Sequence, residues 1–276
     1  MNDSQWNATE PDIKTIKNCF DNPIRALSQA ETPAFVIRNA YNPNHCRELI
    51  ERFELFGFMK DPHRSEADKR PRIDIGTSLG NLGSNPERFF KHAESTHLLF
   101  RFLFDGFDNP VKCIYRNLSA LCPGKTVRTA SENDGTEYGP AIVRIHYDGQ
   151  RYKPHIDHVV LRESRSDFSV YRFKHQFAGV LCLQNADESG PGAQSRLHQC
   201  LWTPDIQPHI ANETFSDYAK KNRIKYCQVE LNPGDLYFFN TQLIHEVPEI
   251  VGTQPRVVMA VFIGYSPEDH EVAVWS

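Results

Sequence analysis

The sequence predicts a mainly β protein with N-terminal helices, in which the helices pack against a double-stranded β-helix, the jelly-roll (cupin-like) sandwich. Three observations predict this class. Apolar residues recur at helical spacing in the first part of the chain, whereas from residue 141 onward short β-branched and aromatic runs follow one another closely. The breaks between those runs carry Gly, Pro and Asn, which form tight turns. Many short strands joined by turns indicate a sandwich or barrel rather than alternating strand–helix units.

The first part of the chain is expected to be a helical layer with loops. One helix is predicted to start at Asn42-Pro43 and to end near Gly57, because apolar residues between them recur at helical spacing. Residues 86–107 predict a second helix for the same reason. Two stretches rich in charge, Gly or Pro are expected to be loops, residues 61–83 and 123–140.

The remaining residues, 141–276, are expected to form the jelly-roll core, so that residues 1–276 are one domain with 1–140 as its helical layer and lid loops. A helix-like insert at 212–222 interrupts the strands, and His245 lies on a short run that is expected to be a strand of its own. The other predicted strands are residues 141–147, 155–161, 177–184, 196–202, 224–231, 235–240 and 256–265.

Composition excludes several classes of protein. A net charge of −4 gives no sign of a nucleic-acid footprint, and no apolar run approaches the roughly 20 residues of a membrane span. The N-terminus is polar and acidic, so a secretory signal is not expected. The seven cysteines are widely spaced and never form Cys-x-x-Cys, which favours buried thiols over disulfides or a zinc site. We therefore expect a cytoplasmic protein that binds neither nucleic acid nor membrane.

The motif that carries chemistry is Pro154-His155-Ile156-Asp157. On a strand, residues two apart point to the same face, so His155 and Asp157 are both expected to enter the barrel. The best candidate for a second histidine is His245, which follows a Pro-Gly-Asp turn and an apolar strand. Two histidines and one carboxylate on one face leave three positions open on a metal, which is the ligand set of non-haem Fe(II) oxygenases.

A His-x-Asp motif occurs by chance in many proteins, and a single distant histidine adds little. Arg256 makes the pattern more specific, because it lies eleven residues after His245 at the start of an apolar strand. An arginine in this position usually faces solvent. If the strand returns beside the metal, however, its planar guanidinium can bind a carboxylate with two hydrogen bonds.

Two segments resemble a known family. The run IVRIHYDGQRYKPHID is similar to the opening motif of Fe(II)/2-oxoglutarate dioxygenases, including the prolyl-hydroxylase-like branch. The tail from Asn232 to Ser276 resembles, nearly end to end, the C-terminus of the free-standing halogenases that act on cyanobacterial indole alkaloids, and it also fits the related hydroxylases of N-acylated amino acids. The resemblance covers roughly residues 105–276 and is loose before that.

The resemblance implies that His155, Asp157 and His245 are the iron ligands and that Arg256 binds the distal carboxylate of 2-oxoglutarate. Fe(II), 2-oxoglutarate as cosubstrate and O2 are the cofactors it implies. The halogenases carry Gly where this chain has Asp157, and the missing carboxylate leaves room for chloride on iron. With Asp157 present, hydroxylation is the expected outcome.

Other residues carry weaker signals. Tyr147 is a candidate to hydrogen-bond 2-oxoglutarate. A role in packing is at least as well supported, because the halogenases have an aliphatic residue at this position. His146 and Tyr152 also lie just before the ligand strand. His158 could orient a ligand, but an exposed histidine at the end of a strand is the favoured reading.

The expected function is oxidative decarboxylation of 2-oxoglutarate coupled to hydroxylation of an aliphatic C–H bond in a small molecule. The segment 158–175 is rich in cations and follows the ligand strand, so it could be a lid over an anionic substrate such as an acylated amino acid; a solvated surface loop is the alternative. Residues 70–83 are a second candidate lid. A halogenase, a desaturase and a prolyl-hydroxylase-like protein hydroxylase stay open, and a non-enzymatic binding module fits the four residues least well.

Overall fold

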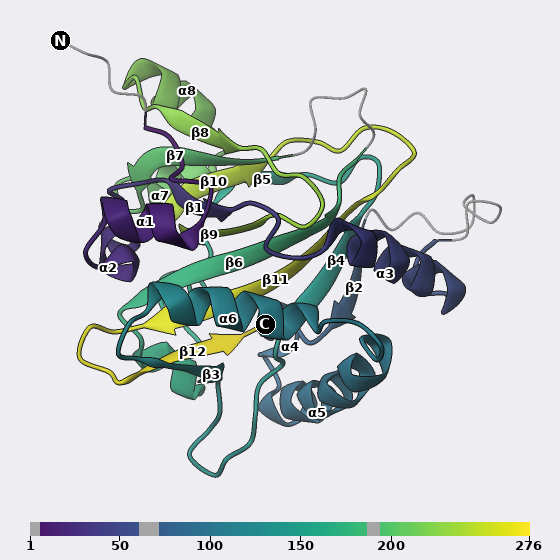
Figure 1. Ribbon diagram of the computed structural model, residues 1–276. Helices are drawn as coiled ribbons and strands as arrows, with labels where there is room; N and C mark the ends of the chain where they lie inside the picture. Colours follow the sequence, from purple (N-terminus) through teal and green to yellow (C-terminus); the bar gives the residue numbers. More distant parts are fainter. Residues whose placement is uncertain (1–5, 61–71, 187–193) are drawn as a thin grey trace.

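The computed structural model describes residues 6–60, 72–186 and 194–276 and contains two facing β-sheets with helices along one side (Figure 1). Within these ranges the larger sheet has eight strands and the smaller has four, and all but one of the strand pairs are antiparallel. The mainly β prediction is confirmed.

The long strand β11 (Arg256–Tyr265) organises the larger sheet. One edge of β11 pairs with β6, and the other edge is shared by two strands, because β4 pairs with its first half and β12 with its second. Beyond these lie β9 and β1 on the first side, β2 next to β4, and β3 next to β12. The bounds are β1 (Ala34–Ile37), β2 (Arg72–Gly76), β3 (Thr126–Thr129), β4 (Ile142–His146), β6 (His175–Gln184), β9 (Leu236–Asn240) and β12 (Glu271–Trp275).

The smaller sheet packs on the face of the larger sheet that points away from helices α3 (Pro43–Leu55) and α6 (Pro110–Leu121). Its strands follow the order β5, β10, β7 and β8, so the two strands that carry the predicted histidines are neighbours. Their bounds are β5 (Tyr152–His155), β7 (Ser195–Leu201), β8 (Tyr226–Val229) and β10 (Leu243–Val247).

Four helices begin with the same dipeptide, Asn-Pro. Each asparagine is the N-cap and its side-chain oxygen accepts a hydrogen bond from a backbone N–H of the first turn, while the proline occupies the first helical position, where no N–H is needed. These helices are α2 (Pro23–Ser28), α3 (Pro43–Leu55), α5 (Pro86–Leu103) and α6 (Pro110–Leu121). The other helical segments are α1 (Ile13–Cys19), α4 (Leu79–Leu82), α7 (Gln207–Ala211), α8 (Phe215–Lys221) and the 3₁₀ turn η1 (Ser169–Arg172).

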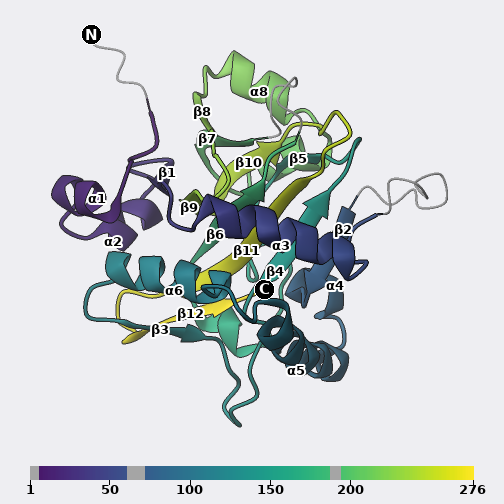
Figure 2. The ribbon, with the colours of Figure 1, turned by 45° about the vertical axis from the view of Figure 1, so that its right-hand side comes forward.

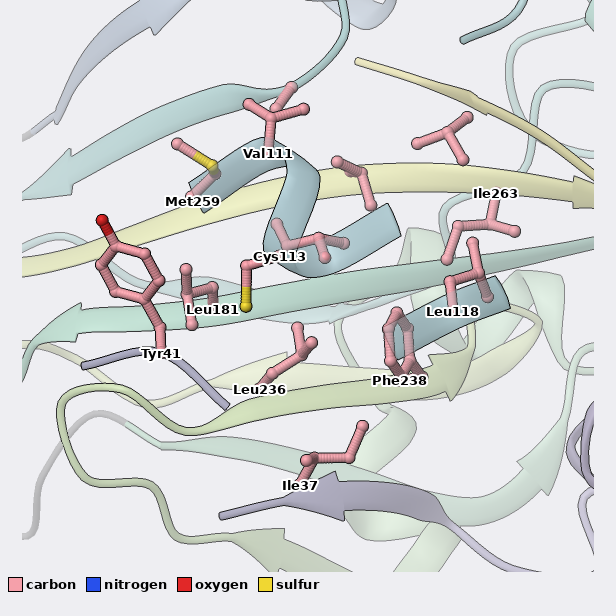
Figure 3. Close-up of a cluster of buried hydrophobic side chains, with 14 of the residues drawn as sticks. Ile37, Tyr41, Val111, Cys113, Leu118, Leu181, Leu236, Phe238, Met259 and Ile263 are labelled. Atoms are coloured by element: carbon pink, nitrogen blue, oxygen red, sulfur yellow. The ribbon is translucent and has the colours of Figure 1, made fainter. Parts of the chain in front are cut away.

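The two faces of the larger sheet have different partners. Helices α3 and α6 lie along the outer face of β6 and β11 (Figure 2), and side chains of α6 such as Cys113 and Leu118 face Leu181, Phe238 and Met259 of the strands (Figure 3). Residues of alternate parity point the other way and pack against the smaller sheet, namely Ala178, Val180, Tyr237, Phe239 and Val258. Because side chains alternate along a strand, one sheet contributes both to the main core and to the interior of the sandwich.

The first 140 residues are more than the expected helical layer, because β1, β2 and β3 join the larger sheet. β1 and β3 have only four residues each, and β3 lies in a stretch whose Gly and Pro content predicted a loop. Part of the other predicted loop, residues 61–71, lies outside the described residues. All seven cysteines are free thiols; five are buried, whereas Cys19 is exposed and Cys200 is half-buried. None of the described helices is long and apolar enough to cross a bilayer.

Gly264 of β11 allows the ring of Phe173 to pack directly on the sheet. A Cβ at position 264 would lie 2.3 Å from Cδ2 of Phe173, which is buried against Trp275. Gly264→Ala is therefore expected to lower the free energy of unfolding by about 1–3 kcal/mol in urea titrations, because the ring must move. In a Phe173→Ala background the same substitution should cost much less. Equal costs in the two backgrounds would contradict this account.

Candidate metal centre

Two of the predicted ligands are brought together by strand pairing. β5 and β10 run antiparallel, and their register places His245 directly opposite His155. The two imidazole centroids are 4.2 Å apart. Both side chains face the interior of the sandwich, so two nitrogen donors from distant parts of the chain meet at one point.

Asp157 reaches the same point from a loop and not from a strand. The prediction that residues 155–161 form a strand is wrong, because β5 ends at His155. The loop is held in place by the larger sheet: Gln176 Nε2 donates to the carbonyl oxygen of Asp157 (3.2 Å), and Gln176 Oε1 accepts from the backbone N–H of Val159 (2.8 Å). The backbone N–H of Asp157 donates to the carbonyl of Thr241. These hydrogen bonds hold the loop in the place of the backbone hydrogen bonds that a neighbouring strand would have made.

The three side chains present their free donor atoms to one another. Asp157 Oδ2 lies 3.7 Å from His155 Nε2 and 3.4 Å from His245 Nε2, and the ligand atoms of all three residues lie within 4.8 Å of one another. Among the described residues, this is the group of His, Cys, Asp and Glu side chains whose spacing suits a metal ion.

The tautomers of both histidines suit metal binding. His155 Nδ1 donates to the carbonyl of Lys153 (2.7 Å), and His245 Nδ1 donates to the carbonyl of Leu243 (2.8 Å). With Nδ1 protonated, the lone pair of each neutral imidazole is on Nε2, which is the atom that faces Asp157. The donor set therefore fits a divalent metal ion bound by two nitrogens and one carboxylate oxygen.

The electrostatics keep His245 and Asp157 in the protonation state that a metal needs. Burial lowers the pKa of His245, and the neighbouring His155 lowers it further. Burial alone would raise the pKa of Asp157, but the two imidazoles beside it outweigh burial and hold that pKa well below its usual range. Both groups are thus unprotonated at neutral pH.

Arg162 holds the other oxygen of the aspartate. Its guanidinium donates to Asp157 Oδ1 at 2.6 Å and to the carbonyl of Ile156 at 3.1 Å. Because Oδ1 is engaged, Oδ2 is the oxygen left for the metal, so Arg162 favours a carboxylate that binds through one oxygen. Arg162 belongs to the predicted lid segment, which explains part of the charge seen there.

Arg256 lies in a cavity that extends from the three ligands between the two sheets. This inner cavity is lined by the polar groups of Arg256, Ser195 and Tyr237 and by apolar residues of both sheets, among them Val180 and Val247. Arg256 is buried, with 5% of its surface exposed, and no ion pair joins it to a carboxylate of the described residues. The hydroxyls of Ser195 and Tyr237 share a hydrogen bond of 2.7 Å. A buried guanidinium beside two hydroxyls suits a carboxylate ligand.

Tyr147 does not face the inner cavity. Residues 142, 144 and 146 of β4 line the cavity, so Tyr147 has the opposite parity and packs against the main core. Its hydroxyl accepts a hydrogen bond from the backbone N–H of Lys60 (2.8 Å). The packing interpretation of Tyr147 fits this position better than contact with 2-oxoglutarate.

Tyr152 and His146 occupy the cavity instead. The hydroxyl of Tyr152 shares a hydrogen bond of 3.0 Å with His146 Nε2 and accepts another from Arg72 at 3.0 Å. The alternation of β4 predicts this arrangement: once the run was assigned as a strand, counting parity would have placed Arg144 and His146 together on the cavity face and Tyr147 on the other.

His158 is buried, so the interpretation of an exposed histidine at the end of a strand is wrong. Its Nδ1 accepts from the backbone N–H groups of Val160 (3.2 Å) and Leu161 (3.4 Å) and so shapes the turn after the ligand loop. The cations of the segment 158–175 are mostly paired: Arg165 with Glu163, Arg172 with Asp269 and Glu271, and Lys174 with Glu268.

Removal of the Arg162 guanidinium is expected to weaken metal binding. In Arg162→Met, Asp157 loses the bond that orients its carboxylate, so Fe(II) or Zn(II) affinity should fall about 10- to 100-fold, measured by competition with a chelating dye. Arg165→Met, which removes a cation of the same segment that does not touch Asp157, is the matched control. Equal affinity in Arg162→Met and the wild-type protein would contradict the role given to Arg162.

The buried His158 is expected to make the metal-free protein less stable in acid. Burial lowers its pKa from the ordinary 6.5 to about 4. The stability that the neutral ring contributes is therefore present above pH 6.5 and is lost as the pH falls towards 4, because the unfolded chain takes up a proton that the folded chain refuses. Between pH 7 and pH 5 this group alone should account for a loss of about 2 kcal/mol in urea titrations. His158→Gln should remove that part of the loss; an unchanged pH dependence in the variant would contradict it.

Comparison with known proteins agrees with this geometry. The model of the carrier-protein-independent halogenase WelO5 family matches residues 7–276. No curated protein matches the chain. Among solved structures, a novel N-substituted L-amino acid dioxygenase from Burkholderia ambifaria AMMD is similar, with 18% identity, a TM-score of 0.60, and coverage of 92% of this chain and 90% of the other. A structure of that dioxygenase in complex with alpha-KG gives the same values.

At this identity the structural likeness establishes the fold, which is the jelly roll expected from the sequence. The family match spans nearly the whole chain and includes the three clustered residues. The chain therefore belongs to the carrier-protein-independent halogenase (WelO5) family, within the Fe(II)- and 2-oxoglutarate-dependent enzymes that its sequence resembles.

Proposed function

We propose that the protein is a hydroxylase, in which oxidative decarboxylation of 2-oxoglutarate is coupled to hydroxylation of an aliphatic C–H bond in a small molecule. The observation that supports this choice within the family is the carboxylate of Asp157. It lies between the two histidines, where the halogenases that the chain resembles carry Gly, and its Oδ2 is within 4 Å of both Nε2 atoms.

His155, Asp157 and His245 would hold Fe(II) from one side. Iron and 2-oxoglutarate together supply the oxidising power for attack on an unactivated C–H bond. The protein provides the ligand geometry, and burial lowers the pKa of His245. Because the third protein position is filled by a carboxylate whose other oxygen is bound to Arg162, a halide would have to displace a charged and hydrogen-bonded side chain.

Arg256 would bind the far carboxylate of 2-oxoglutarate. Its guanidinium lies at the start of β11, opposite His146 on β4, and shares the inner cavity with the three ligands. Ser195 and Tyr237 offer hydroxyls beside it. Apolar side chains of both sheets line much of the rest of the cavity in which the cosubstrate would lie.

A halogenase is the second candidate, because the matching family is described by that activity. The two candidates differ in whether an anion can reach the metal beside Asp157.

Anaerobic addition of Fe(II) and 2-oxoglutarate should produce a visible charge-transfer band in the wild-type protein. Loss of a residue that only hydrogen-bonds a ligand lowers metal affinity about 10- to 100-fold, so Asp157→Ala, which removes a ligand itself, should lower it at least as much. The variant should also no longer release succinate. Arg256→Met should keep the metal but bind 2-oxoglutarate about 10- to 100-fold more weakly, because a charged hydrogen bond is lost.

Chloride distinguishes hydroxylase from halogenase without a known substrate. If the carboxylate of Asp157 fills the position, chloride should leave the band of the wild-type protein unchanged. A chloride-dependent shift of the band would favour the halogenase, and a band that persists in Asp157→Ala with wild-type metal affinity would overturn the assignment of the ligand.

A further inference from the structure

A second pocket adjoins the candidate metal ligands His155 and Asp157, and Arg256 is not among its lining residues. Among the described residues, this outer pocket is lined by six cationic side chains and by two carboxylates, Asp157 and Glu163. The cations are Arg72, Arg144, Arg151, Lys153, Arg162 and Arg165. Such an excess of cations favours an anionic ligand if at least one of the cations is not already paired with a carboxylate of the protein.

Five of the six cations have a carboxylate partner inside the protein. Each lies within 4 Å of a carboxylate oxygen and is therefore partly neutralised. The pairs are Arg72 with Asp74 (2.9 Å), Arg151 with Glu249 (3.8 Å), Lys153 with Glu213 (2.6 Å), Arg162 with Asp157 (2.6 Å) and Arg165 with Glu163 (3.6 Å).

Arg144 is the exception among the described residues. Its Nε is buried and has no hydrogen-bond partner, and no ion pair joins its guanidinium to a described carboxylate. The carboxylate directly opposite on β2, that of Asp74, binds Arg72 and the amide of Asn81 (3.2 Å) through Oδ2, while its Oδ1 is buried without a hydrogen-bond partner. A half-buried cation without a partner is costly for a folded protein, and a ligand anion would remove that cost.

Arg144 lies where the two pockets meet. It lines both the inner cavity and the outer pocket, a property that it shares with Tyr152, Phe262 and the ligands His155 and Asp157. On the larger sheet it is opposite Val258, two residues after Arg256 and on the same face. The face of the larger sheet that lines the inner cavity thus carries the guanidinium groups of Arg144 and Arg256, and neither has a carboxylate partner among the described residues.

We infer that Arg144 is the binding residue for a carboxylate on the primary substrate, which would be held next to the metal while Arg256 holds the cosubstrate. The inference rests on the proposed function and names its substrate class, a small aliphatic or aromatic carboxylic acid. A guanidinium binds a carboxylate with two parallel hydrogen bonds, which fixes the orientation of the acid as well as its charge. Phe262 at the same junction provides an apolar surface for the rest of the molecule.

The test compares acids with their neutral amides. Wild-type protein loaded anaerobically with Fe(II) and 2-oxoglutarate is titrated by calorimetry with N-acetyl-L-leucine, phenylacetate and hexanoate, and with the three matching carboxamides. At least one acid should bind more tightly than its amide. In Arg144→Met that acid should bind about 10- to 100-fold more weakly, because a charged hydrogen-bonded contact is lost, whereas its amide should change little. Arg144→Lys should restore part of the affinity.

Two controls separate this role from others. Arg151→Met removes a cation of the same pocket that is paired with Glu249, and it should leave the preference for the acid unchanged. The charge-transfer band of Arg144→Met with Fe(II) and 2-oxoglutarate should match that of the wild-type protein. Loss of the band in this variant would assign Arg144 to the cosubstrate and overturn the inference.

The remaining outcomes are also decisive. If no acid is preferred over its amide by the wild-type protein, or if Arg144→Met keeps the preference, Arg144 is not a substrate-binding residue. If the wild-type protein forms no band at all, the proposed function fails, and the same titrations with Zn(II)-loaded protein still decide whether Arg144 binds carboxylates.

Discussion

The pairing of β5 with β10 is the constraint on which the site depends. Ninety residues separate His155 from His245, yet the register of one antiparallel pair places them opposite each other with their rings 4.2 Å apart. Each ring is then fixed by a hydrogen bond that its Nδ1 donates to a backbone carbonyl of its own strand. The orientation of both Nε2 atoms thus follows from backbone geometry, and only the third ligand needs support from the rest of the fold.

That support comes from the larger sheet. Gln176 on β6 is buried and holds both the carbonyl of Asp157 and the N–H of Val159, so the ligand loop is attached to the sheet that also carries Arg256. The two sheets therefore contribute different parts of the site. The smaller sheet carries the histidines, whereas the larger sheet positions the aspartate loop and carries the cations of the cavity. A change in sheet packing would alter the distance between the two histidines and Arg256.

The sequence was sufficient to predict the sandwich, His155, Asp157 and His245 as a group, and the free thiols. It was not sufficient for β1 and β3, because a strand of four residues is stabilised by its neighbours in the sheet and has little pattern of its own. The prediction that Asp157 continues the strand was wrong for a related reason: the bonds that hold it come from Gln176 and Thr241, which are distant in the chain. Tyr147 is different, because the alternation of β4 already contained the information that it faces away from the cavity.

Ion pairs between distant residues likewise could not be predicted from the sequence. The cations between residues 158 and 175 suggested an anionic substrate, but the residues that neutralise them, such as Glu268 and Glu271, lie about a hundred positions away and could not be assigned to them from the sequence. Pairing must be known before net charge can be interpreted.

The charges of the described residues at the site, together with Fe(II) and 2-oxoglutarate, favour an acid as substrate. Fe(II) would contribute +2, Asp157 −1 and Arg162, which shares that carboxylate, +1; 2-oxoglutarate would contribute −2 and Arg256 +1, which gives +1 in total. His146 between these groups stays neutral, because burial and the nearby Arg256, Arg144 and Arg72 hold its pKa well below the usual range. Arg144 raises this sum to +2 from a half-buried position, whereas each of the other cations that line the outer pocket already has a carboxylate partner. A monoanionic substrate would lower that charge and pair with Arg144, whereas a neutral substrate would leave Arg144 without a carboxylate partner among the described residues.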